Sequence, residues 1–170
     1  LTMAPSEIKQ CFDEAGLSEG TDEDTVSWWD ILSQASRGYQ NEKLLERGRK
    51  GERLSINHER ERTGREPVYI ALDTAIPGYD ILSTVSKTDE TILCIEVKST
   101  DQSINQAYFH LSRNEYKQAI IHENYVIHLW LLNPEPRLLE VPFSMVESHC
   151  PVDKNDGGWE SVKIPFKSFE

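Results

Sequence analysis

The stretches P-G-Y-D, Pro77 to Asp80, and I-E-V-K, Ile95 to Lys98, decide the fold of this chain. The second stretch lies within T-I-L-C-I-E-V-K-S, residues 91–99, which has the composition of a β-strand. Successive side chains of a strand point to opposite faces, so Glu96 and Lys98 share one face of the expected sheet. The sequence therefore predicts a carboxylate and an amine side by side on one strand.

A second strand is predicted over Y-D-I-L-S-T-V, residues 79–85, joined to the first by the polar loop S-K-T-D-E, residues 86–90. If the loop is centred on Thr88, Asp80 lies opposite Glu96, whereas a centre shifted by half a residue breaks this pairing. Cross-strand Cβ atoms lie about 5 Å apart, and like charges held there destabilise a sheet unless something compensates them. We therefore expect Mg²⁺ or Mn²⁺ between the two carboxylates, because such ions take oxygen ligands.

A third acidic residue, Glu52, lies in a segment that reads as a helix over residues 41–62. Glu52 falls on the apolar stripe of this helix together with Ile56, and a buried acid needs a cation or a hydrogen-bond partner. Gly48 and Gly51 weaken a helix by up to about 1 kcal/mol each, which indicates a close approach of its backbone to another element. The alternative is a frayed surface helix, with the charges of the strands having a purely structural role.

Five blocks in the same order resemble the NO VEIN C-terminal domain family, within the PD-(D/E)XK nuclease superfamily. Between Gly48 and Leu132 they read G-R-K-G-E, G-Y-D-I-L-S, I-E-V-K-S-T, F-H-L-S-R-N-E-Y-K-Q-A and E-N-Y-V-I-H-L-W. The resemblance implies an α/β fold with a restriction-endonuclease-like core, in which helices flank a mixed central sheet. Residues 1–40 and 142–170 carry no feature of the family.

By this resemblance, Glu52 is the acid of the first core helix and Lys98 is the catalytic lysine. Asp80 and Glu96 are the metal-binding carboxylates, and we expect the backbone carbonyl of Val97 to join them. The expected reaction is metal-assisted hydrolysis of a nucleic-acid phosphodiester, with DNA as the expected substrate and RNA left open. Lys98 either orients the attacking water or stabilises negative charge, since a general base needs a strongly lowered pKa. Glu52 binds a metal-ligated water or a second metal.

The chain is expected to consist of three parts. These are an acidic helical arm over residues 1–40, a nuclease-like domain over residues 41–141, and a C-terminal extension over residues 142–170. The arm contains predicted helices over residues 7–15 and 27–35, the second with a stripe expected to pack as core. Besides the segments above, the elements predicted are strands over residues 68–72, 125–132, 138–141 and 161–166 and a helix over residues 113–122. Ser112 and Glu115 predict a capping box at the start of that helix.

The net charge of −11 is unfavourable for a protein that approaches a polyanion. The charge is uneven, because residues 1–36 carry eight acids and one base, whereas residues 37–65 carry nine bases and five acids. Some of these bases could meet phosphates, although a solvated helix face is the more ordinary interpretation. We therefore expect other domains or subunits to supply most of the nucleic-acid affinity, and self-association as a homo-oligomer is a further expectation.

The three cysteines are widely spaced and no secretory signal is evident, which predicts free thiols and an intracellular location. No apolar run approaches the ~20 residues that cross a bilayer, so no membrane partner is expected. The five histidines lack zinc-site spacing, and the chain has no phosphate-binding glycine loop and no nucleophile elbow.

Two functions of different class follow. The first is an active nuclease, serving as the effector module of a restriction or anti-phage defence protein. The second is a catalytically inactive module of the same fold that binds DNA or mediates assembly. The complete set of Glu52, Asp80, Glu96 and Lys98 favours the nuclease, since a module without chemistry has no need of acids that repel each other. The acidic composition favours the binding module.

Overall fold

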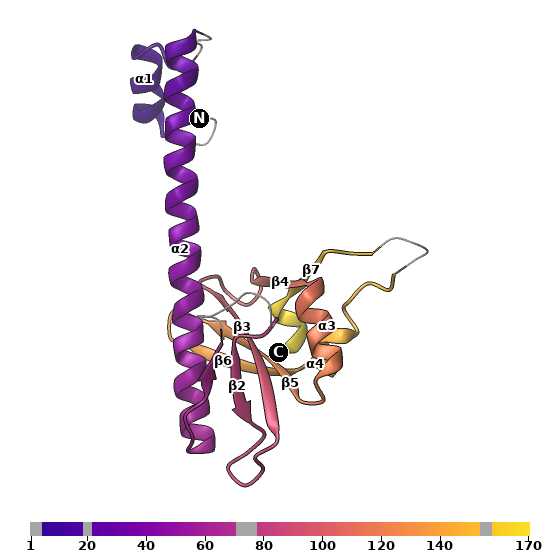
Figure 1. Cartoon of the computed structure of the whole chain (residues 1–170). Helices are drawn as coiled ribbons and strands as arrows, with labels where there is room; N and C mark the ends of the chain where they lie inside the picture. The colour runs from indigo at the N-terminus through magenta and orange to yellow at the C-terminus, as the bar shows by residue number, and fades with distance from the viewer. Residues whose placement is uncertain (1–4, 19–21, 71–77, 154–157) are drawn as a thin grey trace. The chain divides into compact units, whose positions relative to one another are not determined.

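The computed structural model describes residues 5–18, 22–70, 78–153 and 158–170 (Figure 1). The chain divides into two compact units, Leu1–Leu44 and Leu45–Glu170. Across the described residues, no helix has both the length and the apolar character needed to cross a membrane.

The first unit holds helix α1, Ser6–Glu14, and the first part of helix α2, Glu23–Thr63. The prediction of two separate helices over residues 27–35 and 41–62 is wrong, because both belong to α2. The segment between them contains Gly38, which costs only about 1 kcal/mol in a helix interior, and no proline.

The stripe of α2 that was expected to be packed core is largely exposed. Ile31 is 64% exposed and Leu32 is 40% exposed. The apolar contacts of this unit come from an aromatic cluster in which Phe12 stacks on Trp29 at a ring-centroid distance of 5.4 Å and meets Trp28 edge-on at 5.8 Å. The indole of Trp29 donates a hydrogen bond to the carbonyl of Leu17 at 2.9 Å.

In the described part of the second unit, the main sheet has five strands in the order β1-β2-β3-β5-β6. Their bounds are Val68–Tyr69, Ile81–Thr84, Ile92–Thr100, Tyr125–Leu131 and Arg137–Pro142. β3 pairs antiparallel with β2 and parallel with β5, so the predicted mixed sheet is confirmed. The strand predicted over residues 68–72 corresponds to β1, and its residues 71–72 lie outside the described part of the chain.

A second, two-stranded sheet pairs β4, Tyr108–Ser112, with β7, Ser161–Pro165. β4 was not predicted, although its burial alternates with the period of a strand: Phe109 and Leu111 are buried and their neighbours Tyr108 and His110 are exposed. The remaining elements are helix α3, Arg113–Ile121, helix α4, Phe143–Glu147, and the 3₁₀ helix η1, Phe166–Phe169.

Two hydrophobic cores lie on opposite faces of the main sheet. On one face Ile56 of α2 packs against Ile81 and Ile95. On the other face α3, α4 and the small sheet cover β3, β5 and β6 (Figure 1). The buried side chains that residues 142–170 contribute to this larger core are Phe143, Val146, Ile164 and Phe166. The C-terminal segment is therefore part of the packing that supports the sheet.

Candidate functional site

Asp80 lies at the start of the β2–β3 hairpin, at the point predicted from the loop. The ladder pairs Ile81 with Ile95, which is the register predicted from a loop centred on Thr88, and Asp80 lies one residue before the first paired residue of β2. The backbone N–H of Asp80 donates to the carbonyl of Ile95 at 2.9 Å, and its carboxylate accepts from the N–H of Val97 at 2.8 Å. Asp80 is thus bound to β3 on both sides of Glu96.

The backbone before Tyr79 and Asp80 requires a glycine, Gly78. Its φ is +69°, a backbone conformation that residues other than glycine rarely adopt. A Cβ at this position would lie 2.8 Å from Cγ of Gln118 and 3.0 Å from Nδ2 of Asn114. Its carbonyl accepts a hydrogen bond from the hydroxyl of Tyr125 at 2.7 Å. The glycine therefore lets the chain pass close to α3 and β5 immediately before Asp80.

Glu96 and Lys98 share one face of β3, as predicted, and both point away from α2. The ammonium of Lys98 lies 2.7 Å from Oε1 of Glu96 and 2.8 Å from Oε1 of Glu115, which belongs to the first turn of α3. The three side chains are 19%, 6% and 17% exposed, in the order Lys98, Glu96 and Glu115. Sequence reasoning assigned Glu115 only to the capping box, because proximity to Lys98 depends on how α3 packs on the sheet.

Burial dominates the electrostatics of the two predicted metal ligands. It raises the pKa of Asp80 to about 6, against the lowering effects of the Val97 hydrogen bond and the charge of Lys98. Burial also raises the pKa of Glu96 well above its ordinary value, with Lys98 opposing the rise and Asp80 adding to it. Both carboxylates are therefore harder to ionise than usual, and a cation bound between them would stabilise their charged forms.

Lys98 and Glu115 are shifted in the opposite direction. Burial lowers the pKa of Lys98, but the charges of Glu96 and Glu115 outweigh burial and raise this pKa above its ordinary value. Burial likewise raises the pKa of Glu115, and attraction to Lys98 outweighs it, so the net pKa is lowered. Lys98 and Glu115 therefore form an ammonium–carboxylate pair inside the site.

Glu52 reaches the site from α2, on the other side of the sheet from Glu96 and Lys98. Its carboxylate accepts a hydrogen bond from the hydroxyl of Tyr69 in β1, and it interacts electrostatically with Asp80. Burial, together with the Glu52 contact, raises the pKa of Tyr69 to about 12. Asp80 thus lies between Glu52 and Glu96 in the electrostatic network.

The predicted close approach of the helix backbone is found at Gly51. A Cβ on Gly51 would lie 2.8 Å from Cβ of Ser99 and 3.3 Å from Cγ1 of Val97. The hydroxyl of Ser99 donates to the carbonyl of Arg47 at 3.0 Å, which ties α2 to β3 one residue beyond Lys98. The same expectation fails at Gly48, where the nearest group is the Glu52 side chain at 4.0 Å.

The donor set of the site suits a hard divalent cation that keeps part of its own hydration. Across the described ranges, no three or more histidine, cysteine, aspartate and glutamate side chains are arranged to hold a metal ion by themselves. Asp80 and Glu96 supply one partly buried and one buried carboxylate, and two is the number with which Mg²⁺ is commonly bound when waters and substrate phosphate complete its coordination. The carbonyl of Val97 stays a predicted ligand, while its amide binds Asp80.

A second polar cluster is buried between α2 and β5, on the same side of the sheet as Glu52. Nδ1 of His128 lies 3.1 Å from Oγ of Ser55, which also accepts from Nε1 of Trp130 at 2.8 Å. Nε2 of His128 is fully buried without a hydrogen-bond partner and lies 3.9 Å from Glu59. Arg62 neutralises Glu59 at 2.6 Å, so this cluster is a packed ion pair beside a neutral histidine.

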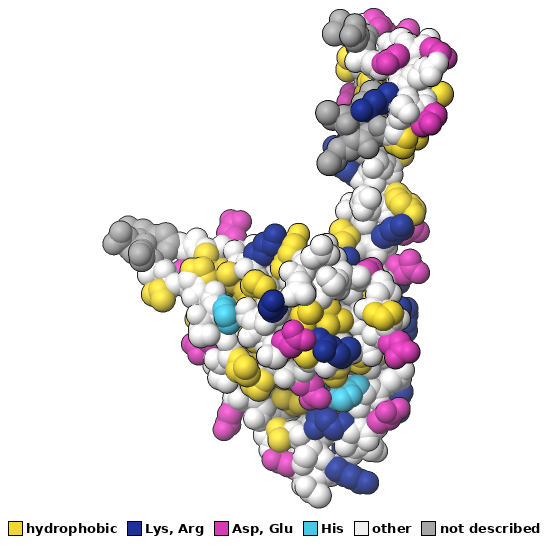
Figure 2. Space-filling view, turned by 180° about the vertical axis from the view of Figure 1, so that it is seen from behind, with side chains coloured by type: hydrophobic (Ala, Val, Ile, Leu, Met, Phe, Trp, Pro, Cys, Tyr) yellow, Lys and Arg dark blue, Asp and Glu magenta, His cyan; other side chains and the backbone are white. Residues whose placement is uncertain are grey.

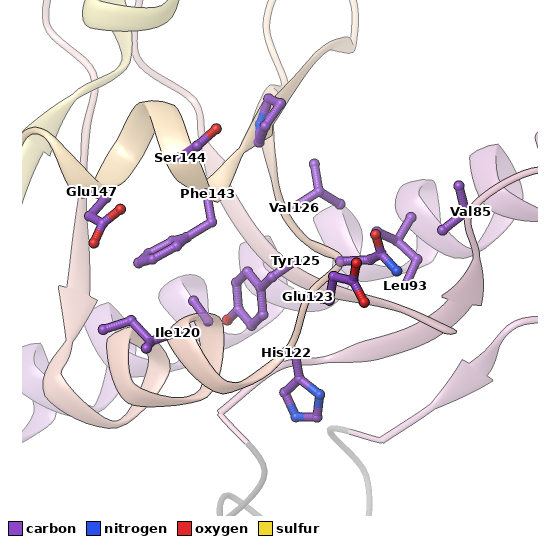
Figure 3. A pocket seen from close by; sticks show the side chains of 13 residues that line it. Val85, Leu93, Ile120, His122, Glu123, Tyr125, Val126, Phe143, Ser144 and Glu147 are labelled. Carbon is purple, nitrogen blue, oxygen red and sulfur yellow. The ribbon is translucent and has the colours of Figure 1, made fainter. Parts of the chain in front are cut away.

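A hollow of about 550 Å³ lies near the beginning of β3 and β5 (Figure 3). Tyr125 and Phe143 lie together in its wall, with ring centroids 5.9 Å apart. None of the five predicted site residues lines it. The candidate site is the carboxylate cluster at the β2–β3 hairpin and not this hollow.

The structure thus defines an α/β domain in which a mixed sheet flanked by helices brings Asp80, Glu96 and Lys98 together. Residues 51–141, more than half of the chain, match the family model described as Protein NO VEIN, C-terminal. The chain belongs to this family, and the resemblance inferred from its five sequence blocks is confirmed.

Among solved structures, the chain is similar to Hjc of Archaeoglobus fulgidus, a Holliday junction resolvase from an archaeal hyperthermophile. The two chains share 20% sequence identity with a TM-score of 0.46, and the similarity covers 72% of this chain and 86% of the resolvase. A comparison with curated proteins gives no match.

Proposed function

We propose that this chain is a metal-dependent nuclease domain that hydrolyses nucleic-acid phosphodiesters, with DNA as its substrate. The observation that carries the proposal is the meeting of Asp80, Glu96 and Lys98 at one point of the hairpin, with Val97 fixing Asp80 at 2.8 Å and Lys98 2.7 Å from Glu96. Buried like charges cost stability, so their retention is best explained by a cation and a chemical task.

In the proposed reaction Asp80 and Glu96 hold Mg²⁺ or Mn²⁺. When bound, the ion polarises the scissile phosphate and lowers the pKa of a coordinated water. The amide of Val97 keeps the Asp80 carboxylate in place before substrate arrives. The ammonium of Lys98 lies beside Glu96, from where it can orient the attacking water or stabilise charge on the phosphate.

Glu52 is proposed to orient a water at the edge of the same site. The charge of Glu52 contributes to raising the pKa of Asp80, which supports a role for Glu52 beside that carboxylate. The hydroxyl of Tyr69 donates to Glu52, which fixes the direction of the acid and leaves it as an acceptor for water.

Most of the affinity for DNA is proposed to come from other domains or subunits. Acidic and basic side chains are interspersed on the face of the molecule shown in Figure 2, and the whole chain carries a net charge of −11. Arg49, Lys50 and Arg53 are exposed near Glu52 on α2 and are the proposed phosphate contacts of this chain itself. A chain that relies on other domains or subunits for its DNA affinity suits the effector module of a restriction or anti-phage defence protein.

Cleavage of supercoiled plasmid DNA with Mg²⁺ or Mn²⁺ tests the proposal. Wild type is expected to nick or linearise the plasmid, and Glu96→Gln and Lys98→Gln are expected to be inactive. Lys87→Ala is the matched control, because Lys87 is an exposed lysine of the β2–β3 loop. Folding of every variant is checked by circular dichroism. Equal cleavage by wild type and Lys98→Gln would show that the activity arises elsewhere.

The second candidate function is a catalytically inactive module that binds DNA or mediates assembly. The acidic composition of the chain favours it, because a nuclease acting alone has to approach a polyanion. It predicts that wild type binds labelled duplex DNA or self-associates, while plasmid stays intact at every metal concentration. Analytical ultracentrifugation with and without duplex DNA measures both properties.

A further inference from the structure

Lys98 is held by two carboxylates that come from different elements of the fold. Glu96 precedes it by two residues on β3, and Glu115 approaches from the first turn of α3. Both oxygens lie within 2.8 Å of its Nζ atom. An ammonium has three N–H donors, so these two contacts leave one donor direction for a third acceptor.

Glu115 differs from Glu96 and Asp80 in how its oxygens are used. Oε1 contacts Lys98 at 2.8 Å, whereas Oε2 accepts from the backbone N–H of Ser112 at 2.6 Å. The N–H of Glu115 in turn donates to Oγ of Ser112 at 3.3 Å, which completes a capping box. Both oxygens of Glu115 therefore have protein donors, and the start of α3 fixes the position of the carboxylate.

We propose that Glu115 is a positioning residue of the candidate site, which fixes the ammonium of Lys98 beside Glu96 and directs its remaining donor toward a phosphate oxygen or water. This inference rests on the proposed function. A long lysine side chain has many rotamers, and a second carboxylate on a rigid helix start selects one of them. Glu115 therefore acts on the reaction through Lys98.

The competing explanation is that Glu115 serves only to cap α3. Two substitutions separate these roles. Glu115→Gln retains the capping box, since glutamine is also found at this position of the motif, but removes the charge that attracts Lys98. Ser112→Ala removes the hydroxyl cap and leaves both the Ser112 N–H and the Glu115 carboxylate in place.

The first readout is plasmid cleavage by the full chain with Mn²⁺. Glu115→Gln is expected to lower kcat at least about tenfold with KM within about twofold of wild type, because a charge-assisted contact to Lys98 is lost while substrate contacts remain. Ser112→Ala is expected to keep kcat within about twofold and to lower the melting temperature by about 2–4 °C.

The second readout is independent of cleavage. A lysine-selective ¹H–¹⁵N spectrum records ammonium groups protected from exchange, and the Lys98 signal is assigned by its loss in Lys98→Gln. We expect Glu115→Gln to broaden or shift this signal and Ser112→Ala to retain it. If Glu115→Gln leaves the signal and kcat unchanged, or Ser112→Ala disturbs both equally, Glu115 is only a cap. If wild type does not cleave, the proposed function fails, and the spectrum alone decides the role of Glu115.

Discussion

The carboxylate of Asp80 accepts a hydrogen bond from the backbone N–H of Val97 at 2.8 Å. Val97 directly follows Glu96, so this bond fixes the two acidic residues next to each other across the hairpin. It also opposes the effect of burial, which raises the pKa of Asp80 to about 6. The hairpin therefore holds a carboxylate in a place where its charge is disfavoured unless a cation binds.

Divalent cations are expected to stabilise the folded chain. Because an ion that binds only the native state acts by mass action, Mg²⁺ or Mn²⁺ at ten times its Kd adds about 1.4 kcal/mol, or roughly 3–6 °C in melting temperature. Thermal unfolding with and without the ion measures the shift. Asp80→Asn is expected to abolish the shift and Lys87→Ala to retain it. A shift of the same size in Asp80→Asn would place the ion elsewhere.

Without metal, Asp80→Asn is expected to stabilise the fold. Raising the Asp80 pKa from 3.8 to about 6 disfavours the charged native form by up to about 3 kcal/mol above pH 7. Asparagine retains an oxygen that can accept from Val97 and removes the charge. We expect a gain of about 1–3 kcal/mol in the urea unfolding free energy at pH 8 with EDTA.

Asp89 in the same hairpin provides the matched control for that substitution. Hydrogen bonds from Thr91 lower the pKa of Asp89, so its charged form is favoured in the folded chain. Asp89→Asn is therefore expected to give no gain in stability. Equal gains in both variants would point to a general effect of reducing the negative charge.

The site could largely be predicted because it depends on local periodicity. The period of two along β3 placed Glu96 and Lys98 on one face, and the loop length placed Asp80 opposite Glu96. Glu115 could not be found in this way. Its contact with Lys98 depends on the packing of α3 against the sheet, and a sequence signal for a capping box does not report which side chain the carboxylate meets.

The fold was predicted less completely where two local signals compete. The capping box at Ser112 marked the start of α3, and the alternating residues before it were not assigned to β4. The helices predicted over residues 27–35 and 41–62 form one 41-residue helix, because Gly38 between them costs only about 1 kcal/mol and does not interrupt it.

Gly51→Ala is expected to destabilise the fold, and Gly48→Ala is expected to stabilise it. Both substitutions favour a helix by up to about 1 kcal/mol. At Gly51 the new Cβ would lie 2.8 Å from Ser99, and overpacking of this kind costs about 1–3 kcal/mol. At Gly48 the nearest group is the flexible Glu52 side chain at 4.0 Å. Urea unfolding of both variants checks the opposite signs, and stabilisation in both would contradict the close approach of α2 to β3.

The buried histidine of β5 is expected to make the fold less stable in mild acid. Burial lowers the pKa of His128 from 6.5 to about 4. The charges of His58 and Arg62 lower this pKa further, whereas the charge of Glu59 opposes the shift. Glu140 of β6 is its strand partner. The unfolded chain binds a proton that the folded chain excludes, so this contribution falls as pH decreases from about 6.5 to about 4.

Between pH 7.5 and pH 5, this one residue accounts for a loss of about 2 kcal/mol in the free energy of unfolding. Because Asp80 has a raised pKa and acts in the opposite direction, the measurement is made in the Asp80→Asn background. His128→Gln removes the titrating ring and is expected to flatten the decrease, whereas His110→Gln, which replaces an exposed histidine of β4, retains it. The prediction fails if urea unfolding gives the same decrease in His128→Gln as in the parent, since another group then binds the proton.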